Sequence, residues 1–364
     1  MSQKINLSQA YIDKEIKQNI IKVVNSGSYI LNNYCREFEG AFSKFIGCKF
    51  GVLSNSATSV MQLTLMALGV GKGDEVIVTS LTAFPTIEPI FHVGAKPVFV
   101  DIDDTYNFDA DLIEKKITKK TKAIITVHLY GNPCNLDKIN YLADKYNLIL
   151  LEDSCQAHGA KYNKQRVGSF GRAGFFSFYP SKNMTFLGDG GIMVTDDEEL
   201  AEKVKMFRDH GRRDKYLHEL VGYNMRANEM QAAVGLVQLK HLNNFNKRRC
   251  QIAKLYNRLL KDLPIILPVE QENGQSVYHM YVIRTEKRDE LADYLKQKNI
   301  FTGVHYPVPC HLQPAVLKNI KKYKLPKTEK YCNEILSLPI HPMMTDAQVM
   351  RVTGEIKRFF IESS

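Results

Sequence analysis

The segment Gly174-Phe-Phe-Ser-Phe-Tyr-Pro-Ser-Lys182-Asn-Met-Thr-Phe-Leu-Gly188-Asp-Gly-Gly191 joins two apolar, strand-like runs through a turn that carries a lysine. Its glycines indicate a backbone with unusual torsion angles or a close approach to another segment. Lys182 is one of 49 lysines and arginines, most of which we expect to be solvated surface charges. Its place in a glycine-framed turn between two strands makes it a candidate catalytic residue.

Upstream of this turn, the apolar run Leu148-Ile-Leu-Leu-Glu-Asp153 ends on an acid. Open α/β sheets bind their ligands at the carboxyl ends of strands, which is where Asp153 would lie. Pyridoxal 5'-phosphate (PLP) chemistry requires a lysine that forms a Schiff base and an acid that keeps the pyridine nitrogen protonated. Lys182 and Asp153 together therefore predict a PLP site.

The segment Ser54-Asn-Ser-Ala57-Thr58-Ser59 has the composition of a strand-to-helix turn. A helix N-terminus presents unpaired N–H groups and a partial positive charge, so it can bind a phosphate group. The hydroxyls of Thr58 and Ser59 would add hydrogen-bond donors. An ordinary Ser/Thr helix cap explains the same residues, and these residues alone leave both interpretations open.

A chain of 364 residues suggests about two domains. We expect a large PLP-binding α/β domain over residues 1–245 and a smaller α+β domain over residues 246–364. No apolar stretch approaches the ~18–20 residues that span a bilayer. The N-terminal residues Met1-Ser-Gln-Lys-Ile-Asn lack an apolar signal core, so a cytoplasmic protein without a membrane partner is expected.

The seven cysteines form no CxxC pair and have no zinc-site spacing, so we expect reduced thiols and no metal. Cys155 follows Asp153 closely but should face away from it if the strand alternation continues. The formal charge of +10 comes from scattered basic residues without a nucleic-acid-binding motif. A solvated basic surface is the simpler interpretation, and the surplus would also favour an anionic substrate.

Short apolar runs alternate with amphipathic helical patterns between about residues 50 and 195, which predicts a mostly parallel sheet covered by helices. The expected strands are Gly51–Ser54, Glu75–Thr79, Pro97–Val100, Ala123–Val127, Leu148–Glu152, Gly174–Phe178 and Gly191–Thr195. The expected helices are residues 13–46 with a break at Gly27, then Ser59–Leu68, Leu136–Tyr146, 226–262 and Asp289–Lys298. Proline-rich loops are expected at 304–314 and 339–342.

Short motifs in order along the chain resemble the sugar aminotransferases of the DegT/DnrJ/EryC1/StrS group, which are PLP enzymes of fold type I. The resemblance covers nearly the whole chain. The motifs are Gly27-Ser-Gly-Ser-Tyr-Ile-Leu, Ser56-Ala-Thr-Ser59, Gly73-Asp-Glu-Val-Ile-Val78, Pro97-Val-Phe-Val-Asp-Ile-Asp103, His128-Leu-Tyr-Gly131, Glu152-Asp-Ser-Cys-Gln-Ala-His-Gly159, Ser177-Phe-Tyr-Pro-Ser-Lys-Asn183, Gly188-Asp-Gly-Gly191 and Gly222-Tyr-Asn-Met-Arg-Ala-Asn-Glu229.

The resemblance implies a role for several residues of the cofactor site. Lys182 would be the Schiff-base lysine and proton shuttle, and Asp153 would pair with the pyridine nitrogen. Gln156 would contact the ring hydroxyl. Asn224 would reach the cofactor phosphate of a neighbouring subunit, which implies a homodimer with shared active sites.

The phosphate and ring contacts show two departures from the family pattern. Ala57 and Thr58, helped by Ser177, would bind the phosphate, but many members have glycine where Ala57 stands. Many members also have an aromatic residue at the position of Ala83, where it stacks on the cofactor ring. Ala83 offers only a methyl group, and Phe84 follows one place later, so we expect weaker stacking on the ring.

The substrate side rests on one loop and two tyrosines. His305, Tyr306 and His311 belong to a loop that resembles the family loop near the nucleotide-sugar, although a proline-rich surface loop would look the same. Tyr179 stands where many relatives have histidine, and it would bind the sugar or serve only for packing. Tyr29 is a similar candidate.

The activity implied is transfer of an amino group from glutamate to a nucleotide-linked keto-sugar, with PLP and pyridoxamine 5'-phosphate alternating. The His128, Tyr179 and His311 motifs look more like the members that work on 3-keto sugars. We therefore expect a dTDP-3-keto-6-deoxyhexose as substrate and a dTDP-3-amino-3,6-dideoxyhexose as product. The alternatives are a UDP-linked 3-keto sugar, a 4-keto-6-deoxy sugar, or a PLP-binding regulatory protein without sugar turnover.

Overall fold

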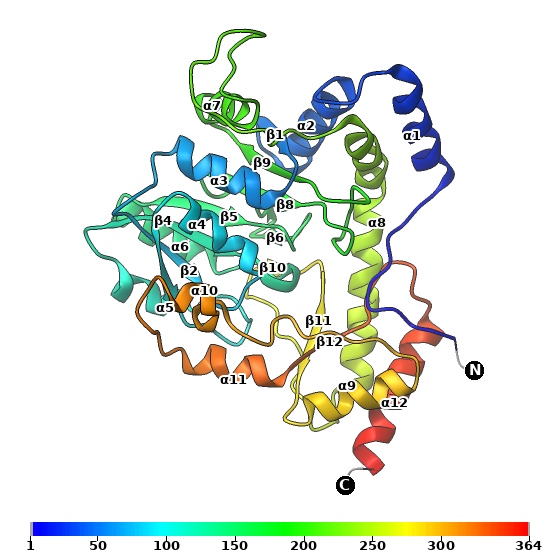
Figure 1. Ribbon diagram of the computed structural model, residues 1–364. Coiled ribbons are helices and arrows are strands. Elements are labelled where there is room, and N and C mark those ends of the chain that lie inside the picture. Colours follow the sequence, from blue (N-terminus) through cyan, green and yellow to red (C-terminus); the bar gives the residue numbers. More distant parts are fainter. Residues whose placement is uncertain (1–2, 363–364) are drawn as a thin grey trace.

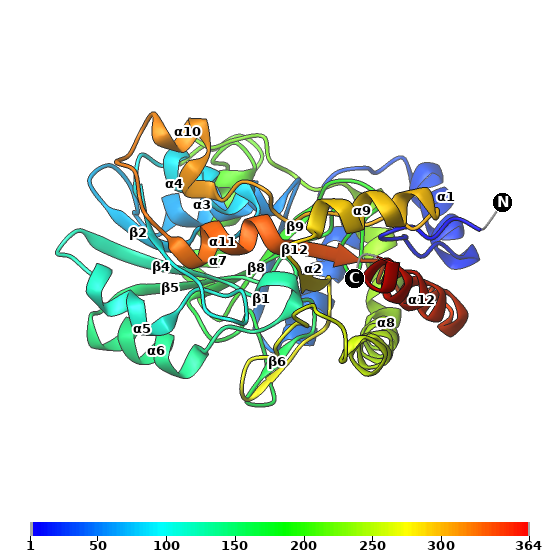
Figure 2. The same ribbon diagram turned by 90° about the horizontal axis from the view of Figure 1, so that it is seen from below.

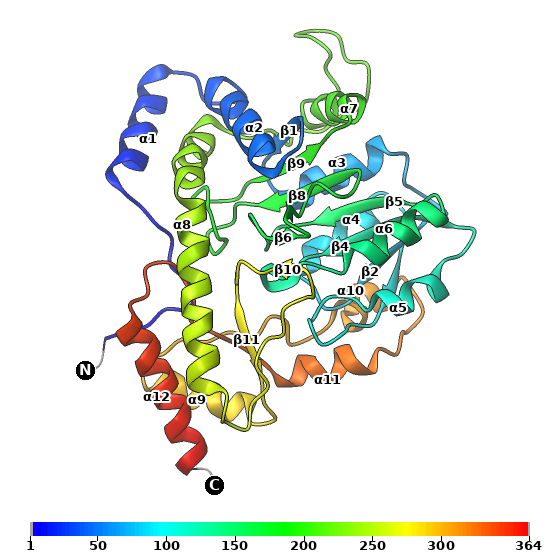
Figure 3. The same ribbon diagram turned by 180° about the vertical axis from the view of Figure 1, so that it is seen from behind.

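The computed structural model describes residues 3–362 and is shown in Figures 1 and 3. Within that range a central sheet of seven strands has the order β1-β9-β8-β5-β4-β2-β3. Its strands are β1 (Phe50–Ser54), β2 (Glu75–Thr79), β3 (Lys96–Val100), β4 (Thr121–Val127), β5 (Ile149–Asp153), β8 (Ala173–Ser177) and β9 (Gly191–Thr195). All neighbouring pairs are parallel except those made by β9, which runs antiparallel to β1 and β8. The predicted mostly parallel α/β sheet is confirmed.

The strands alternate their side chains between two covered faces, as their apolar runs require. Val76 and Val78 of β2 belong to one core cluster with residues of α3 (Ala57–Ala67), α4 (Glu88–His92) and α7 (Glu198–Arg208). Ile77 of the same strand faces α5 (Ala110–Ile113) and α6 (Leu136–Lys145) on the opposite side. Figure 2 shows these two helical layers above and below the sheet.

The β1–β9 side of the sheet is covered by aromatic side chains from a helix that the sequence predicts correctly. The break at Gly27 separates α1 (Lys14–Ser26) from α2 (Asn33–Ile46). Phe38 and Phe42 of α2 pack on Phe178 with ring centroids 5.2 and 5.4 Å apart. The long α8 (Glu229–Leu260) closes this side.

The C-terminal part forms a smaller α+β unit beside the sheet. Strands β11 (Tyr281–Arg284) and β12 (Ile335–Leu338) pair antiparallel, and α9 (Arg288–Gln297) and α12 (Asp346–Glu362) pack on them. Ile5, near the other end of the chain, joins the same core. The division at residue 245 stays a prediction, and α8 runs through it without a break.

Several elements were not predicted. A small sheet joins β6 (Lys161–Tyr162) and β7 (Gln165–Arg166) to β10 (Gly274–Gln275). The proline-rich loop at 304–314 contains the turn η4 (Cys310–Leu312) and leads into α10 (Pro314–Leu317) and α11 (Pro326–Glu334). The remaining short turns are η1 (Phe84–Thr86), η2 (Glu114–Lys116) and η3 (Leu129–Gly131). None of the helices in the described range is long and apolar enough to cross a membrane.

Candidate active site

A cavity of about 370 Å³ opens at the carboxyl ends of the parallel strands. Val127, Asp153 and Ser177 are the last residues of the neighbouring strands β4, β5 and β8, so parallel pairing brings them to one edge. The cavity is lined by ten of the residues selected from the sequence: Ala57, Thr58, Ala83, Asp153, Gln156, Ser177, Tyr179, Lys182, His305 and Tyr306.

The lysine turn between β8 and β9 is held close to the start of α3. A Cβ atom added to Gly191 would lie 2.1 Å from the backbone nitrogen of Ala57, so this position requires glycine. The backbone N–H of Lys182 donates to the carbonyl of Tyr179 at 2.9 Å. Burial lowers the pKa of the Lys182 amine, opposed by the nearby Cys155 and Asp153. A lowered pKa gives the amine more of the neutral form that takes up protons.

The Asp153 carboxylate accepts hydrogen bonds on both oxygens. Oδ2 accepts from the Thr86 hydroxyl at 2.6 Å, and the Thr82 hydroxyl lies 2.9 Å from that of Thr86. Oδ1 accepts from the backbone N–H of Cys155 at 3.1 Å. These donors fix the carboxylate's orientation. Thr82 and Thr86 both line the cavity, and neither was predicted.

Gln156 and the loop of His305 and Tyr306 meet on another wall of the cavity. The Gln156 carbonyl oxygen accepts from the backbone N–H of Tyr130 at 2.8 Å, which leaves its amide to donate to the Tyr306 hydroxyl at 3.3 Å. Burial and the nearby Lys182 lower the pKa of His305 to about 4. Its Nδ1 lies 2.9 Å from the hydroxyl of Ser337, so His305 is a neutral, anchored side chain at neutral pH.

The residues around the cavity fit PLP. The first turn of α3 contributes Ala57 and Thr58, capped by Ser56, whose hydroxyl accepts the Ser59 N–H at 3.0 Å. This helix terminus suits a phosphate group. A fixed carboxylate suits a pyridine nitrogen and a lysine amine suits an aldehyde. All three groups face one cavity, as PLP needs. No group of His, Cys, Asp and Glu side chains within residues 3–362 could hold a metal ion.

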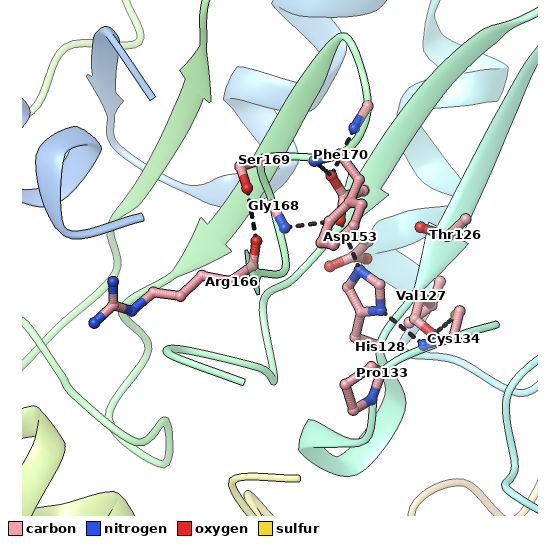
Figure 4. Close-up of polar contacts among 12 residues, drawn as sticks. Thr126, Val127, His128, Pro133, Cys134, Asp153, Arg166, Gly168, Ser169 and Phe170 are labelled. Carbon is pink, nitrogen blue, oxygen red and sulfur yellow. Dashed lines mark hydrogen bonds and ion pairs between the residues drawn. The ribbon is translucent and has the colours of Figure 1, made fainter. Parts of the chain in front are cut away.

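Glu152 precedes Asp153 in β5 and is fully buried, and Figure 4 shows polar contacts in this region. Glu152 accepts backbone N–H bonds from Gly168 at 2.7 Å, Phe170 at 2.6 Å and Gly171 at 2.8 Å. Its Oε2 also lies 3.1 Å from Nε2 of His128. Because Nδ1 of His128 accepts the Cys134 N–H at 3.0 Å, the ring proton belongs on Nε2 and points to Glu152. His128 therefore anchors the strand end, and it is not among the residues that line the cavity.

We predict that Glu152→Ala destabilises the protein by about 3–5 kcal/mol, because it leaves buried N–H groups without an acceptor. The measurement is denaturant unfolding of the cofactor-loaded protein. Glu199→Ala, at an exposed glutamate on α7, is the matched control and should change stability by less than about 0.5 kcal/mol. Equal unfolding midpoints for the two variants would contradict the anchoring role of Glu152.

Three predicted site residues are not brought to this cavity. His311 is fully buried, with Nδ1 2.6 Å from the Ser80 hydroxyl and Nε2 3.2 Å from Glu329. The two ring nitrogens thus hold the loop to Ser80 and to α11. Tyr29 is 47% exposed and donates to the carbonyl of Val24. Asn224 is exposed and accepts from Nε of Arg226 at 3.1 Å.

Other residues of the cavity were not predicted from the sequence. Cys155 was expected to face away but lines the cavity, because β5 ends at Asp153 and the chain turns there. Burial raises the pKa of its thiol well above the ordinary value, so it is a protonated side chain. His279, Met280 and Asp189 also line the cavity. A buried histidine in the segment Ser276-Val-Tyr-His279 gave no sequence signal of its own.

Comparisons with known proteins place the chain among aminotransferases. The model of the DegT/DnrJ/EryC1/StrS aminotransferase family matches residues 10–357. A dTDP-3-amino-3,6-dideoxy-alpha-D-galactopyranose transaminase of Aneurinibacillus thermoaerophilus is 42% identical over 95% of both chains. A pleiotropic regulatory protein of Geobacillus stearothermophilus is 41% identical over 98% of both chains.

Two solved structures are similar to this chain over nearly its whole length. S. venezuelae DesV in complex with a ketimine intermediate has a TM-score of 0.94 at 39% identity, and the match covers 98% of this chain and 99% of DesV. The NtdA protein of Bacillus subtilis with bound cofactor PMP has a TM-score of 0.87 at 30% identity, and the match covers 98% of this chain and 87% of NtdA.

Fold, cavity and comparisons agree on the class of enzyme, an aminotransferase of fold type I that works with PLP and its amino form. The chain belongs to the DegT/DnrJ/EryC1/StrS aminotransferase family.

Proposed function

We propose that this enzyme transfers an amino group from glutamate to C3 of a dTDP-linked 3-keto-6-deoxyhexose, giving a dTDP-3-amino-3,6-dideoxyhexose. The coarser activity, amination of a nucleotide-linked keto-sugar, rests on the family and its relatives. The observation that carries the proposal is the single cavity that joins Lys182, Asp153 and the start of α3. The choice of sugar is supported by the full-length relative named for this kind of product.

The chain's own residues divide the work as follows. The N-terminus of α3 and Ser177 would hold the cofactor phosphate, Asp153 the pyridine nitrogen and Gln156 the ring hydroxyl. When bound, PLP supplies an electron sink for the reacting carbon. Nζ of Lys182 takes a proton from that carbon in one half-reaction and returns one in the other, which its lowered pKa favours.

Tyr179, His305 and Tyr306 would orient the sugar and exclude water beside the cofactor. Their positions on the cavity wall support that role. Because the phosphate and Asp153 fix the cofactor, one sugar carbon at a time can reach the reacting position. Small errors in seating lose much of the rate advantage of proximity, so one ketone should be strongly preferred.

The regiochemistry is tested by incubating the enzyme with glutamate and a panel of dTDP- and UDP-linked 3-keto and 4-keto sugars. Mass spectrometry and NMR then locate the new amino group. We expect the dTDP-linked 3-keto-6-deoxy sugar to turn over at least about tenfold faster than the others. A badly placed ketone needs to raise the activation free energy by only about 1.4 kcal/mol to lose that much rate. Turnover of 4-keto sugars alone would refute C3 amination and leave the aminotransferase assignment standing. Preference for a UDP-linked 3-keto sugar would correct only the nucleotide.

A second candidate function is regulatory PLP binding without sugar turnover, favoured by the Geobacillus relative named as a regulatory protein. The two functions differ in one simple measurement. Glutamate should convert the bound cofactor of a competent aminotransferase to its amino form, which changes the absorbance spectrum. A spectrum that glutamate, and every other amino donor tried, leaves unchanged would favour the regulatory alternative.

We also propose that the active unit is a homodimer in which Asn224 completes the partner's site. The residue lies outside the cavity of its own chain, in the exposed segment after α7. Exposed apolar side chains surround the same end of the molecule, including Tyr223 at 37%, Ile30 at 48% and Val221 at 93% exposed. Apolar surface of this kind suits an interface between subunits.

Asn224→Ala should therefore weaken cofactor retention about tenfold, the loss expected for one hydrogen bond to a charged phosphate. At a cofactor concentration that leaves Asn224→Ala mostly unloaded, mixing it with Lys182→Ala should raise the activity in hybrid dimers, because one of the two sites then has both residues intact. Asn319→Ala, at an exposed asparagine far from α7, is the control. An active monomer, or mixtures without restored activity, would contradict the shared site.

A further inference from the structure

The surplus of positive charge is not at the active site. Of the described residues that line the cavity, Lys182 is the single lysine or arginine. The formal charge of +10 therefore does not concentrate where an anionic substrate would bind. It has to be sought on another surface of the molecule.

Nine exposed or half-buried lysines gather at the opposite end of the sheet, and we call this group the lysine surface. Its members are Lys72, Lys96, Lys116, Lys119, Lys120, Lys318, Lys321, Lys322 and Lys324. They come from the amino ends of β2, β3 and β4 and from the segment after α10. Figure 2 shows this end of the sheet at the left, with α10 above and α5 below.

Packing contacts hold these segments together. Nζ of Lys116 lies 5.7 Å from the ring centroid of Tyr323, and that ring packs edge-on against Phe99 of β3 at 5.4 Å. The backbone N–H of Lys96 donates to the carbonyl of Asp74 at 2.9 Å. A groove of about 590 Å³ opens between the strand ends and the Lys318–Tyr323 segment.

The charges of the lysine surface are not neutralised within the described part of the chain. None of the nine ammonium groups forms an ion pair with an acid in residues 3–362. The nearby carboxylate of Glu75 accepts from the Thr118 hydroxyl at 2.6 Å instead. Four lysines and one acid, Glu75, line the groove, so lysine charge is in excess there. Such an excess creates a local positive potential, which attracts an anionic partner.

We propose that the lysine surface docks the enzyme on an anionic lipid surface. All nine residues are lysines, which are compact point charges, whereas arginine is the residue suited to bidentate phosphate recognition. Tyr323 is the one aromatic side chain among the described residues that line the groove, and its ring already contacts Phe99 and Lys116. The groove therefore lacks the row of stacking aromatic residues that single-stranded nucleic acids use. Clustered lysines of this kind are attracted electrostatically to the anionic headgroups of a lipid surface.

The position of the lysine surface leaves the active site free. The cavity lies at the carboxyl ends of strands whose amino ends carry the lysines, and a five-residue strand is about 17 Å long. A docked enzyme would therefore keep its cavity open to the solution. We had expected no membrane partner because the sequence has no apolar span, but a peripheral electrostatic contact needs none.

The test uses cofactor-loaded, full-length protein and sedimentation with lipid vesicles. One set of vesicles is pure phosphatidylcholine and the other contains one phosphatidylserine in four lipids. The variant Lys318→Glu/Lys321→Glu/Lys322→Glu alters the lysine surface. The variant Lys254→Glu/Lys261→Glu/Lys357→Glu changes the net charge equally at exposed lysines of the small C-terminal unit. Aminotransfer without vesicles should be the same in all three proteins.

We expect binding to the anionic vesicles alone, weakened by salt. Each removed lysine should lower partitioning roughly fivefold, so the first variant should lose about two orders of magnitude. The control variant should bind nearly as the unaltered protein does. Equal losses in both variants would overturn the proposal in favour of a net-charge effect. Absence of binding to anionic vesicles, or tighter binding to RNA than to these vesicles, would also overturn it.

Discussion

Replacing Lys182 by alanine should abolish transamination, with a fall in rate of at least about four orders of magnitude. Among the described residues, its amine is the one lysine or arginine group on the cavity wall, and burial lowers its pKa. Without it, no group at that position can move a proton to and from the substrate carbon. The measurement is the steady-state rate with glutamate and a keto-sugar.

The fold should survive this change. Within residues 3–362 no hydrogen bond or ion pair is made by the Lys182 amine, and the turn is held by its backbone bond to Tyr179. Circular dichroism and the unfolding midpoint should therefore stay close to those of the unaltered protein. Borohydride should fix the cofactor covalently to the unaltered chain and not to the variant.

Two further variants separate the possible roles of the lysine. Lys182→Arg keeps a positive charge but cannot lose its proton, so it should be as inactive as the alanine variant. Lys296→Ala, at an exposed lysine of α9, should have full activity. A fast Lys182→Ala enzyme, or an active arginine variant, would show that another group moves the proton.

Asp153→Asn should lower the rate roughly 10²–10³-fold while the protein still binds its cofactor. The amide has the same shape and can still accept the hydrogen bond from Thr86, which lies 2.6 Å away in the unaltered protein. It carries no negative charge, so it cannot hold the proton of a pyridine nitrogen. The measurements are the rate and the amount of cofactor retained after gel filtration.

Comparing Asp153→Asn with Thr86→Val tests whether the charge of the carboxylate or its orientation matters more. Thr86→Val keeps the Asp153 charge but removes the shortest hydrogen bond to it, and should cost about tenfold. Asp144→Asn, at an exposed aspartate of α6, should be neutral. An Asp153→Asn enzyme with an unchanged rate would move the electrostatic role to another residue.

The sequence predicted the sheet well because its strands are apolar runs buried on both faces. The ends of Glu75–Thr79 and Gly191–Thr195 are as predicted, since each run is bounded by polar or glycine residues. The strand predicted at Leu148–Glu152 begins and ends one residue later, at Ile149 and Asp153, because Asp153 still pairs with β4 and β8. The C-terminal part was predicted less completely, since its strands are short and separated by proline-rich loops.

The candidate site was predicted where motifs carry local signals and missed where contacts are remote. Lys182 and Asp153 stand in recognisable turns, and both line the cavity. Thr86 reaches Asp153 across 67 residues, so its role depends on the folded sheet. His311 was misplaced because a motif shows that a loop approaches the site, but not which of its side chains turns inward.

The helix α8 makes the two halves of this enzyme mechanically dependent. It runs for 32 residues, about 48 Å, from the core under β9 to the core of the C-terminal unit. No proline interrupts it, and a Cβ atom on its Gly235 would lie 2.3 Å from the ring of Phe186 in the lysine turn's own core. The helix is thus continuous between the two halves, and it packs closely on the turn that carries Lys182. A hinge motion between the two halves would therefore have to bend a continuous helix.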